Sequence, residues 1–465
     1  MENQVRFTKQ MNNNFFYIAS RISKITWTQE EKDNIIQFCE GIKQDEKLQR
    51  SFFQYCKQWK LGPWVYVQLQ KNHLYEHFSE AVILDFKDLH DKIKQQNQQR
   101  IDEAVKFLKL FKERNIPVAV LKGNLFMHTI YHDIGYKKMN DFDMLIHPED
   151  WPKVQEIYDE LNYIPLGFGW SGEKEEAAKF SHAGMSFISP NFHCITGTQW
   201  GIKSPTSAYT VNNQELWECT LEFQLQDTSI KKLSPEHNLL HLILHMGLYK
   251  IGIRDCMDVY NLMLAEKIDE DKFVAIAEES NAIEKAYFTL KISDHCSGTI
   301  PKSLLDKLQY NSKSFIIKRL KSRLNMLSQG VDLHRSYNDY FKDIEMKVFY
   351  FNLFPQFHKK FACLFSINKL LIWPKQKYVY KLNDISKSAN ILKKLYARIK
   401  APWLVLKLVG EEIGVGIVFL LLLKLHIDQL LSLANYFRKK KSYFDYLEER
   451  GLQPEKIIKA VKNIE

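Results

Sequence analysis

Two aspartates separated by one residue are the strongest chemical signal in this 465-residue sequence. Asp141 and Asp143 lie in the segment 141–146, where polar and apolar residues alternate as in a half-buried strand. Because strand side chains alternate between faces, both carboxylates would point to one side, with Phe142 and Met144 toward the core. Carboxylate oxygens suit hard divalent cations, which also bridge substrate phosphates. The pair therefore predicts metal-assisted chemistry on a phosphate.

A second signal lies upstream, where Lys122-Gly123-Asn124 joins a short β-prone run over 117–121 to a helix expected over 125–132. A glycine at such a turn lets a phosphate approach the backbone, and a helix N-terminus supplies oriented N–H donors. Either motif alone is weak, since an Asp-x-Asp on a surface strand is usually a solvated edge. Their order along the chain gives a phosphate cradle and a metal clamp, the minimum for phosphoryl or nucleotidyl transfer.

The elements that must position these residues fall into four regions. Residues 1–114 are expected to be helical, and 115–230 to form an α/β core. Residues 231–368 are expected to form a helical domain and 369–465 a basic, helical C-terminal region. Two further strands of the core are expected over 183–189 and 194–202. The fold class is therefore an α/β (α+β) core flanked by helical regions.

The composition is that of an ordinary folded protein. Hydrophobic residues make up 45% and charged residues 26%, and 18 Gly with 13 Pro exclude collagen-like and linker-dominated chains. Seven cysteines without a Cys-x-x-Cys pair indicate reduced thiols and not a disulfide frame or a zinc knuckle. The first residues lack the pattern of a signal peptide. We therefore expect a cytoplasmic location.

The net charge of +10 comes from the C-terminal fifth. Residues 369–465 contain 19 Lys+Arg and 9 Asp+Glu, so the preceding residues are neutral. The uncharged run 413–423 is too short to cross a bilayer. Together with the basic cluster 438–441, the segment 403–441 is compatible with weak peripheral contact to an anionic membrane, although a buried helix with solvated charges is the simpler interpretation. Basic and aromatic residues also alternate over 375–381, a pattern compatible with nucleic-acid contact.

Several segments resemble one known family. They are Val120-Leu-Lys-Gly123, Lys137-Lys-Met-Asn-Asp-Phe-Asp-Met-Leu-Ile146 and Pro148-Glu-Asp150. Weaker matches lie downstream, at Ser234-Pro-Glu with His241 and His245, at Arg254 to Asp258, and at Trp373-Pro374. The order and spacing of these segments are similar to those of the uncharacterised nucleotidyltransferase family of the polymerase-β-like superfamily. Only residues 118–163 match at the level of a motif.

The resemblance implies a mixed sheet with flanking helices, and transfer of a nucleoside monophosphate from an NTP, expected to be ATP, with Mg²⁺ or Mn²⁺. In that scheme Asp141 and Asp143 are the catalytic metal ligands, and Gly123 with Asn124 lines the triphosphate. Lys122 and Lys137 would offset phosphate charge. The acceptor is a hydroxyl on a small molecule, sugar, peptide or protein, and the sequence does not choose among them.

Three positions, in two segments, depart from the family pattern. Lys137 stands where the family usually has Arg, which loses the bidentate geometry of a guanidinium. The position that we align with the superfamily's third carboxylate is Gly197, and Gln199 stands where the family has a histidine. The nearby acids Glu215, Glu218 and Asp227 could substitute. The alternative to an active enzyme is therefore a catalytically degenerate protein that binds a nucleotide or a partner.

Two helical pairs have a simpler interpretation than a functional one. His241 and His245 have the spacing of a metal-binding pair, but the leucines around them favour core histidines. Arg254 and Asp258 are expected to form a structural ion pair, with a phosphate contact of Arg254 as the alternative.

Overall fold

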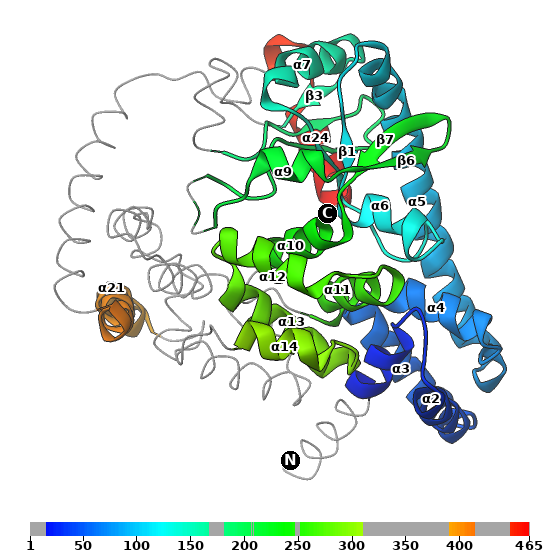
Figure 1. Cartoon of the computed structure of the whole chain (residues 1–465). Coiled ribbons are helices and arrows are strands. Elements are labelled where there is room, and N and C mark those ends of the chain that lie inside the picture. The colour runs from blue at the N-terminus through cyan, green and yellow to red at the C-terminus, as the bar shows by residue number, and fades with distance from the viewer. Residues whose placement is uncertain are drawn as a thin grey trace. The chain divides into compact units, whose positions relative to one another are not determined.

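The computed structural model describes residues 15–166, 181–205, 207, 209–246, 252–309, 390–413 and 447–464. The chain divides into two compact units, one made of Met1–Leu333 with Tyr443–Glu465 and the other of His334–Ser442. The first unit contains the central sheet and the helices that pack on it (Figure 1). In the second unit, the described residues form helix α21 (Ile391–Ile413). The four regional boundaries given above stay predictions.

A mixed five-stranded sheet forms the centre of the first unit, in the order β5-β2-β1-β7-β6. β1 is antiparallel to β2 and parallel to β7, β2 is parallel to β5, and β6 is antiparallel to β7. The strands are β1 (Ala119–Val120), β2 (Phe142–Leu145), β5 (Thr196–Gln199), β6 (Leu221–Leu225) and β7 (Thr228–Lys232). The expected α/β core with a mixed sheet and flanking helices is confirmed.

One face of the sheet is apolar and packs on two helices, α5 (Glu80–Glu113) and α7 (Trp151–Glu160). Phe107 of α5 makes edge contacts with Phe142 of β2 and Tyr158 of α7, at ring-centroid distances of 5.8 and 5.7 Å. Phe142 is fully buried in this layer, which fixes the register of β2. Its neighbour Asp143 must therefore lie on the opposite face of the sheet.

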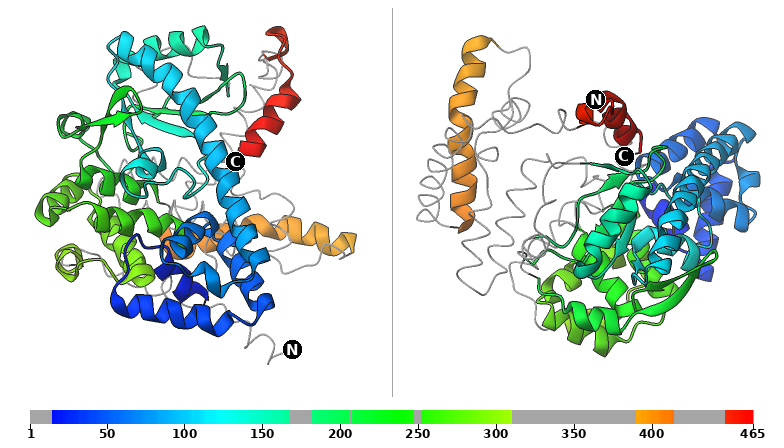
Figure 2. Two further views of the ribbon diagram at one scale, coloured as in Figure 1. Left: turned by 90° about the vertical axis from the view of Figure 1, so that its right-hand side faces the viewer. Right: turned by 90° about the horizontal axis from the view of Figure 1, so that it is seen from above.

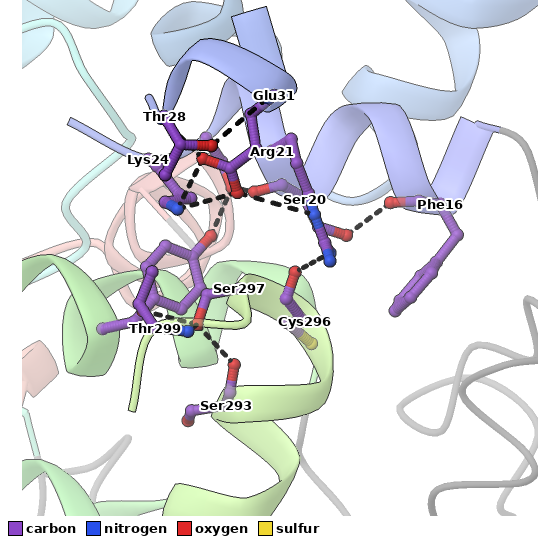
Figure 3. Close-up of polar contacts among 12 residues, drawn as sticks. Phe16, Ser20, Arg21, Lys24, Thr28, Glu31, Ser293, Cys296, Ser297 and Thr299 are labelled. Atoms are coloured by element: carbon purple, nitrogen blue, oxygen red, sulfur yellow. Dashed lines mark hydrogen bonds and ion pairs between the residues drawn. The ribbon is translucent and has the colours of Figure 1, made fainter. Parts of the chain in front are cut away.

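Helices before and after the core pack against one another (Figure 3). A guanidinium N–H of Arg21 donates to the carbonyl of Cys296 near the end of α13, and Lys24 forms a 2.8 Å ion pair with Glu31. Glu31 also closes a capping box with Thr28 at the start of α2. The helices are α2 (Gln29–Ile42), α3 (Glu46–Gln58), α4 (Gly62–Lys71), α10 (Pro235–His245), α11 (Ile253–Ala265), α12 (Glu270–Glu279), α13 (Ile283–Ser297) and α14 (Lys302–Gln309).

The end of the chain returns to the core through α24 (Pro454–Ile464). Leu447 and Ile457 form an apolar cluster with Ile164, Ile188 and Ile195, which lie on or beside the two-stranded sheet of β3 (Ile164–Pro165) and β4 (Phe187–Ile188). Figure 2 shows this helix in red. The remaining short elements are η1 (Tyr75–His77), α6 (Lys122–Thr129), η2 (Pro148–Asp150) and α9 (Asn213–Glu218).

The described residues include no helix with the length and hydropathy that a bilayer-crossing segment requires. Helix α21 exposes a row of apolar side chains between its basic residues, among them Ile391, Leu395 and Trp403. The rest of the segment expected to contact membranes, residues 414–441, lies outside the described residues, as do residues 375–381. Membrane contact and nucleic-acid contact through these segments stay predictions.

Candidate functional site

Asp143 is the centre of the site, and its side chain is almost completely buried, with 5% of the residue exposed. Lys122 donates from Nζ to Oδ2 at 3.0 Å, and Gln199 donates from Nε2 to Oδ1 at 3.1 Å. Both carboxylate oxygens therefore have a donor from the protein, and one donor carries a positive charge. Hydrogen bonds of this kind offset the cost of removing a carboxylate from water.

Lys122 reaches Asp143 from an unusual backbone conformation. It is the first residue of α6, and its φ of 53° lies in the left-handed region. A non-glycine residue loses about 1–2 kcal/mol there because Cβ crowds the following carbonyl. The backbone is anchored next to it, since the N–H of Leu121 donates to the carbonyl of Asp143 at 3.0 Å. Strain of this kind is concentrated at functional sites, and here it directs an ammonium onto the central carboxylate.

Asp141 lies just before β2, and its carboxyl is electrostatically coupled to that of Asp143. Burial and the neighbouring Asp143 charge raise the pKa of Asp141 to about 6, while Lys122 and Arg100 oppose the shift. Asn124 fixes this part of the chain by donating from Nδ2 to the Asp141 carbonyl at 2.9 Å. A carboxyl whose pKa is raised by a neighbouring carboxylate lies in a site that also favours a cation.

The donor set at this position fits one hard divalent cation. Asp141 and Asp143 provide carboxylate oxygens, which Mg²⁺ and Mn²⁺ prefer. Within the described residues, no group of three or more His, Cys, Asp and Glu side chains gathers around a common point. The remaining ligands of such a cation would have to be water and substrate phosphates, which is the usual arrangement for Mg²⁺.

Gly197 lies beside Asp143 on the neighbouring strand. The two residues are register partners in the parallel pair β2 and β5, so a side chain at 197 would point to the same face as Asp143. A Cβ built there would overlap Oδ1 of Asp143 and lie 3.3 Å from its Cγ. The position aligned with the third carboxylate is thus in the place where that acid would act, and the Asp143 side chain leans over the vacant space.

The acids proposed as substitutes do not complete the site within the part of the chain that the structure describes. Glu215 and Glu218 lie on α9, and Asp227 lies in the exposed turn between β6 and β7. Among the residues that the structure describes, no cluster of three acids includes them, and two carboxylates are found at the candidate site.

Gly123 is explained by packing. A Cβ at this position would collide with the end of the Met139 side chain and lie 2.9 Å from the Tyr136 hydroxyl. The absence of a side chain therefore allows α6 to pack closely on the loop that leads to Asp141. The expectation that phosphates approach this glycine and Asn124 stays a prediction.

Lys137 is buried in the same loop and forms an ion pair with Asp258 of α11. Burial lowers the pKa of Lys137, and the Asp258 charge opposes that shift. Asp258 also accepts a 3.0 Å hydrogen bond from the Tyr131 hydroxyl. Arg254 donates instead to the carbonyl of Lys138 at 3.2 Å, so the pair expected between Arg254 and Asp258 is replaced by the pair with Lys137. This ammonium holds the loop on the helices that follow the core.

Further basic side chains lie around the site, and two of them, His182 and Lys203, were not selected by the sequence reasoning. Burial lowers the pKa of His241 well below its usual value, and the nearby charges of Lys122, His182 and Lys203 act in the same direction. Nδ1 of His241 is buried without a hydrogen-bond partner. Lys203 directly follows the strand β5 region and donates to the carbonyl of Leu244 at 2.9 Å. In the sequence, Lys203 could have been noticed only from its position two residues after Gly201, because it belongs to no recognised motif.

Comparison with known families supports the same assignment. Residues 45–298, more than half of the chain, match the model of a family described as an uncharacterised nucleotidyltransferase. The match covers the whole mixed sheet, the Asp141 and Asp143 pair and the helices from α3 through α13. A search of curated proteins found no match. With the strand order, the Lys-Gly turn and the paired aspartates in place, the chain belongs to the uncharacterised nucleotidyltransferase family.

Proposed function

We propose that this protein transfers a nucleoside monophosphate from an NTP to an acceptor hydroxyl, with Mg²⁺ or Mn²⁺ as the metal. The observation that carries the proposal is the pair formed by the half-buried Asp141 and the buried Asp143, beside an ammonium at a helix N-terminus. Carboxylates gather a divalent cation, and the ammonium and helix N-terminus suit the phosphates that such a cation binds. ATP is the NTP to test first.

Each residue has a distinct part in this scheme. Asp141 and Asp143 hold the metal, which when bound polarises the α-phosphate and favours attack by the acceptor oxygen. Lys122, released from Asp143, moves to a phosphate oxygen and offsets its charge. The N-terminal turn of α6, with Gly123 and Asn124, supplies N–H donors to the triphosphate. Lys137 keeps the loop before Asp141 in place through its pair with Asp258.

A second function is favoured by the environment of Asp143. Gly197 supplies no third carboxylate, and Lys122 with Gln199 occupies both oxygens of Asp143. An ammonium in that position can take over the charge balance that a metal provides in an active enzyme. The alternative proposal is a protein that binds a nucleotide or a partner without catalysing transfer.

The experiment that separates these functions uses α-³²P-labelled ATP, GTP, CTP and UTP with a cell lysate as the source of acceptors. Purified wild type, Asp143→Asn and the control Asp159→Asn are compared in Mg²⁺, Mn²⁺ and EDTA, with Asp159 chosen because it is an exposed aspartate of α7. Metal-dependent labelling lost only in Asp143→Asn supports transfer. Nucleotide binding without labelling supports the alternative. If wild type and Asp143→Asn neither bind nor transfer, both proposals are wrong.

A further inference from the structure

A cavity of about 430 Å³ lies between helix α5, the loop before Asp141, the turn after β4 and the C-terminal helix α24. Its volume suits a small organic ligand. The described residues that line it are Gln96, Gln99, Arg100, Lys138, Asn191, Phe192, His193, Lys456, Lys459 and Ala460. Four of these side chains are cationic, and none is acidic.

Neighbouring positive charges repel one another in this pocket. Burial lowers the pKa of Lys138, and repulsion by Lys60, Arg100 and Lys92 lowers it further. Two acids act on the wall: Glu103 binds Asn191 and is itself paired with Lys106, and the Asp141 charge acts on Arg100. An anion in the cavity would relieve the repulsion between the cations.

Arg100 supplies an independent indication of a ligand. Only 3% of this residue is exposed, and burial lowers the pKa of its guanidinium. One terminal N–H donates to Oδ1 of Asn97 at 2.9 Å, while Nε is buried without a hydrogen-bond partner. A buried guanidinium with an unused donor is costly unless something else accepts from it. Arg100 lines the cavity, so an anion there could be that acceptor.

Helix α24 closes the pocket with residues far away in sequence. Lys456 and Lys459 are three residues apart and share one face of the helix. The buried Ile457 anchors the helix to the cluster around Ile164 and Ile188, which holds both ammonium groups at the cavity. This helix lies outside the family match of residues 45–298. The pocket is therefore built partly from a segment that the family model does not include.

The pocket also borders the loop that carries the metal ligands. Lys138 is three residues before Asp141, and the Arg100 charge is close enough to lower the pKa of Asp141. Three residues span at most about 11 Å of extended chain. A ligand anchored in the pocket could present a hydroxyl near Asp141.

We propose that this basic pocket binds the phosphate group of a small, hydroxylated phosphate ester, such as a sugar phosphate, which is the acceptor. Arg100, Lys138, Lys456 and Lys459 bind the phosphate. The amides of Gln96, Gln99 and Asn191 suit ligand hydroxyls, and Phe192 provides an apolar surface. The acceptor role rests on the proposed transferase function, whereas binding of the ester does not.

The reaction implied for such an acceptor balances without another reagent. A hydroxyl oxygen of the ester attacks the α-phosphorus of the NTP and forms a new P–O bond. The bond between the α-phosphorus and the bridging oxygen breaks, pyrophosphate leaves with that electron pair, and the hydroxyl proton passes to water. The products are a nucleotidylated ester and pyrophosphate.

The test is calorimetric titration of the full chain with glucose 6-phosphate, ribose 5-phosphate, glycerol 3-phosphate, inorganic phosphate and glucose, without NTP or metal. We expect at least one ester to bind more tightly than inorganic phosphate, and glucose not to bind. Lys459→Glu should weaken ester binding at least about tenfold, because it places a carboxylate beside the phosphate. The matched control is Lys462→Glu, which reverses an exposed charge on the same helix outside the cavity lining. It should bind within about twofold of wild type.

Further variants separate this proposal from the function of the metal pair. Arg100→Gln, checked for folding by circular dichroism, should also weaken ester binding, whereas Asp143→Asn should bind as wild type even if transfer is lost. Absence of binding at millimolar ester would overturn the proposal. So would equal losses in Lys459→Glu and Lys462→Glu, or equal affinity for the esters and inorganic phosphate. Failure of the labelling experiment would not change these readouts.

Discussion

Asp143 and Arg100 are both almost completely buried, with 5% and 3% of each residue exposed, but their charges have different surroundings. Each oxygen of Asp143 accepts a hydrogen bond from a protein side chain, and Lys122 balances its charge. Arg100 has a neutral hydrogen-bond partner in Asn97, the Asp141 charge nearby, and a buried Nε without a partner. The Asp143 carboxylate therefore has its hydrogen-bond partners within the protein, whereas the Arg100 guanidinium keeps an unused donor.

This difference indicates how the two sites should respond to ligands. A metal at Asp143 must replace existing interactions, so its net binding energy is the difference between two favourable states. An anion in the basic pocket would reduce the repulsion between cations and accept a hydrogen bond from the unused donor. Its binding should therefore raise the free energy of unfolding directly. The acidic site should therefore control the chemical step, and the basic pocket should control the affinity for the acceptor.

The largest effect is expected for Asp143→Asn. The amide keeps the shape of the side chain but cannot hold a metal as a carboxylate does, so kcat for transfer should fall by about a thousandfold or more. The KM for the acceptor should change little. Steady-state kinetics of Asp143→Asn and Lys459→Glu would test the comparison, because the second variant should mainly raise the acceptor KM. Interchanged signatures would contradict the assignment of the two sites.

Lys122→Met should separate metal binding from catalysis. Removal of the ammonium leaves Asp143 without its cation, so Mg²⁺ should bind several-fold more tightly in the absence of nucleotide. Transfer should nevertheless fall by about 10–100-fold, because a phosphate loses its counter-charge. Titration calorimetry with Mg²⁺ and initial rates are the two measurements. Lys153→Met, at an exposed lysine paired with Asp150, is the control and should change neither quantity.

Gly197→Ala tests whether the Asp143 side chain needs the space that the missing side chain at position 197 leaves. The added Cβ would overlap Oδ1 of Asp143, so the carboxylate must rotate away from Gln199. We expect kcat to fall by about 5–50-fold, with a small loss of thermal stability. Gly201→Ala is the matched control, since a Cβ there has its nearest contact at 3.4 Å, with the side chain of Asn213. Equal effects of the two substitutions would argue against a special role for position 197.

The smallest effect is expected at His90, which ties α5 to the loop between the two sites. Burial of the imidazole ring lowers the pKa of His90, but hydrogen bonds to Asp133 and Asp91 outweigh this effect and raise the pKa above 6.5. The pairs measure 3.1 and 3.0 Å. Because the protonated form is favoured in the folded state, this stabilisation is present below the ordinary histidine pKa. It is lost as the pH rises through the raised value.

His90→Gln should therefore reduce the free energy of unfolding by about 1 kcal/mol near pH 5.5, and by less above about pH 8. Urea unfolding across this range is the measurement. His73→Gln, at an exposed histidine, provides the control and should show no such pH dependence. A loss for His90→Gln that grows with pH would mean that the histidine is neutral in the folded state.

Local patterns were sufficient to predict the part of the sheet that carries the two aspartates. The alternation over 141–146 and the apolar run over 117–121 identify β2 and β1, and the burial of Phe142 and Met144 follows from the same alternation. The hairpin of β6 and β7 was not predicted as strands. Its inner strand owes its place to pairing with β1, an interaction between distant segments that periodicity does not report.

Interactions that cross long stretches of sequence set the limit of sequence reasoning at the site itself. Lys137 and Asp258 are 121 residues apart, so the helical spacing of Arg254 and Asp258 pointed to the wrong partner. Lys456 and Lys459 line the same pocket as Arg100 through another long-range interaction. Their position depends on the packing of Ile457, and no local sequence motif predicts that contact.

The position of α24 has a practical and an evolutionary consequence. A shortened chain limited to the family region would expose Ile164 and Ile188 and lack the wall formed by Lys456 and Lys459. Such a chain would be prone to aggregation, and a substrate screen performed on it would not detect the acceptor. In the same way, substitutions in one short terminal helix could redirect substrate choice while the sheet and its aspartates stay unchanged. Substrate selectivity and the chemical step could then evolve through substitutions in different segments of the chain.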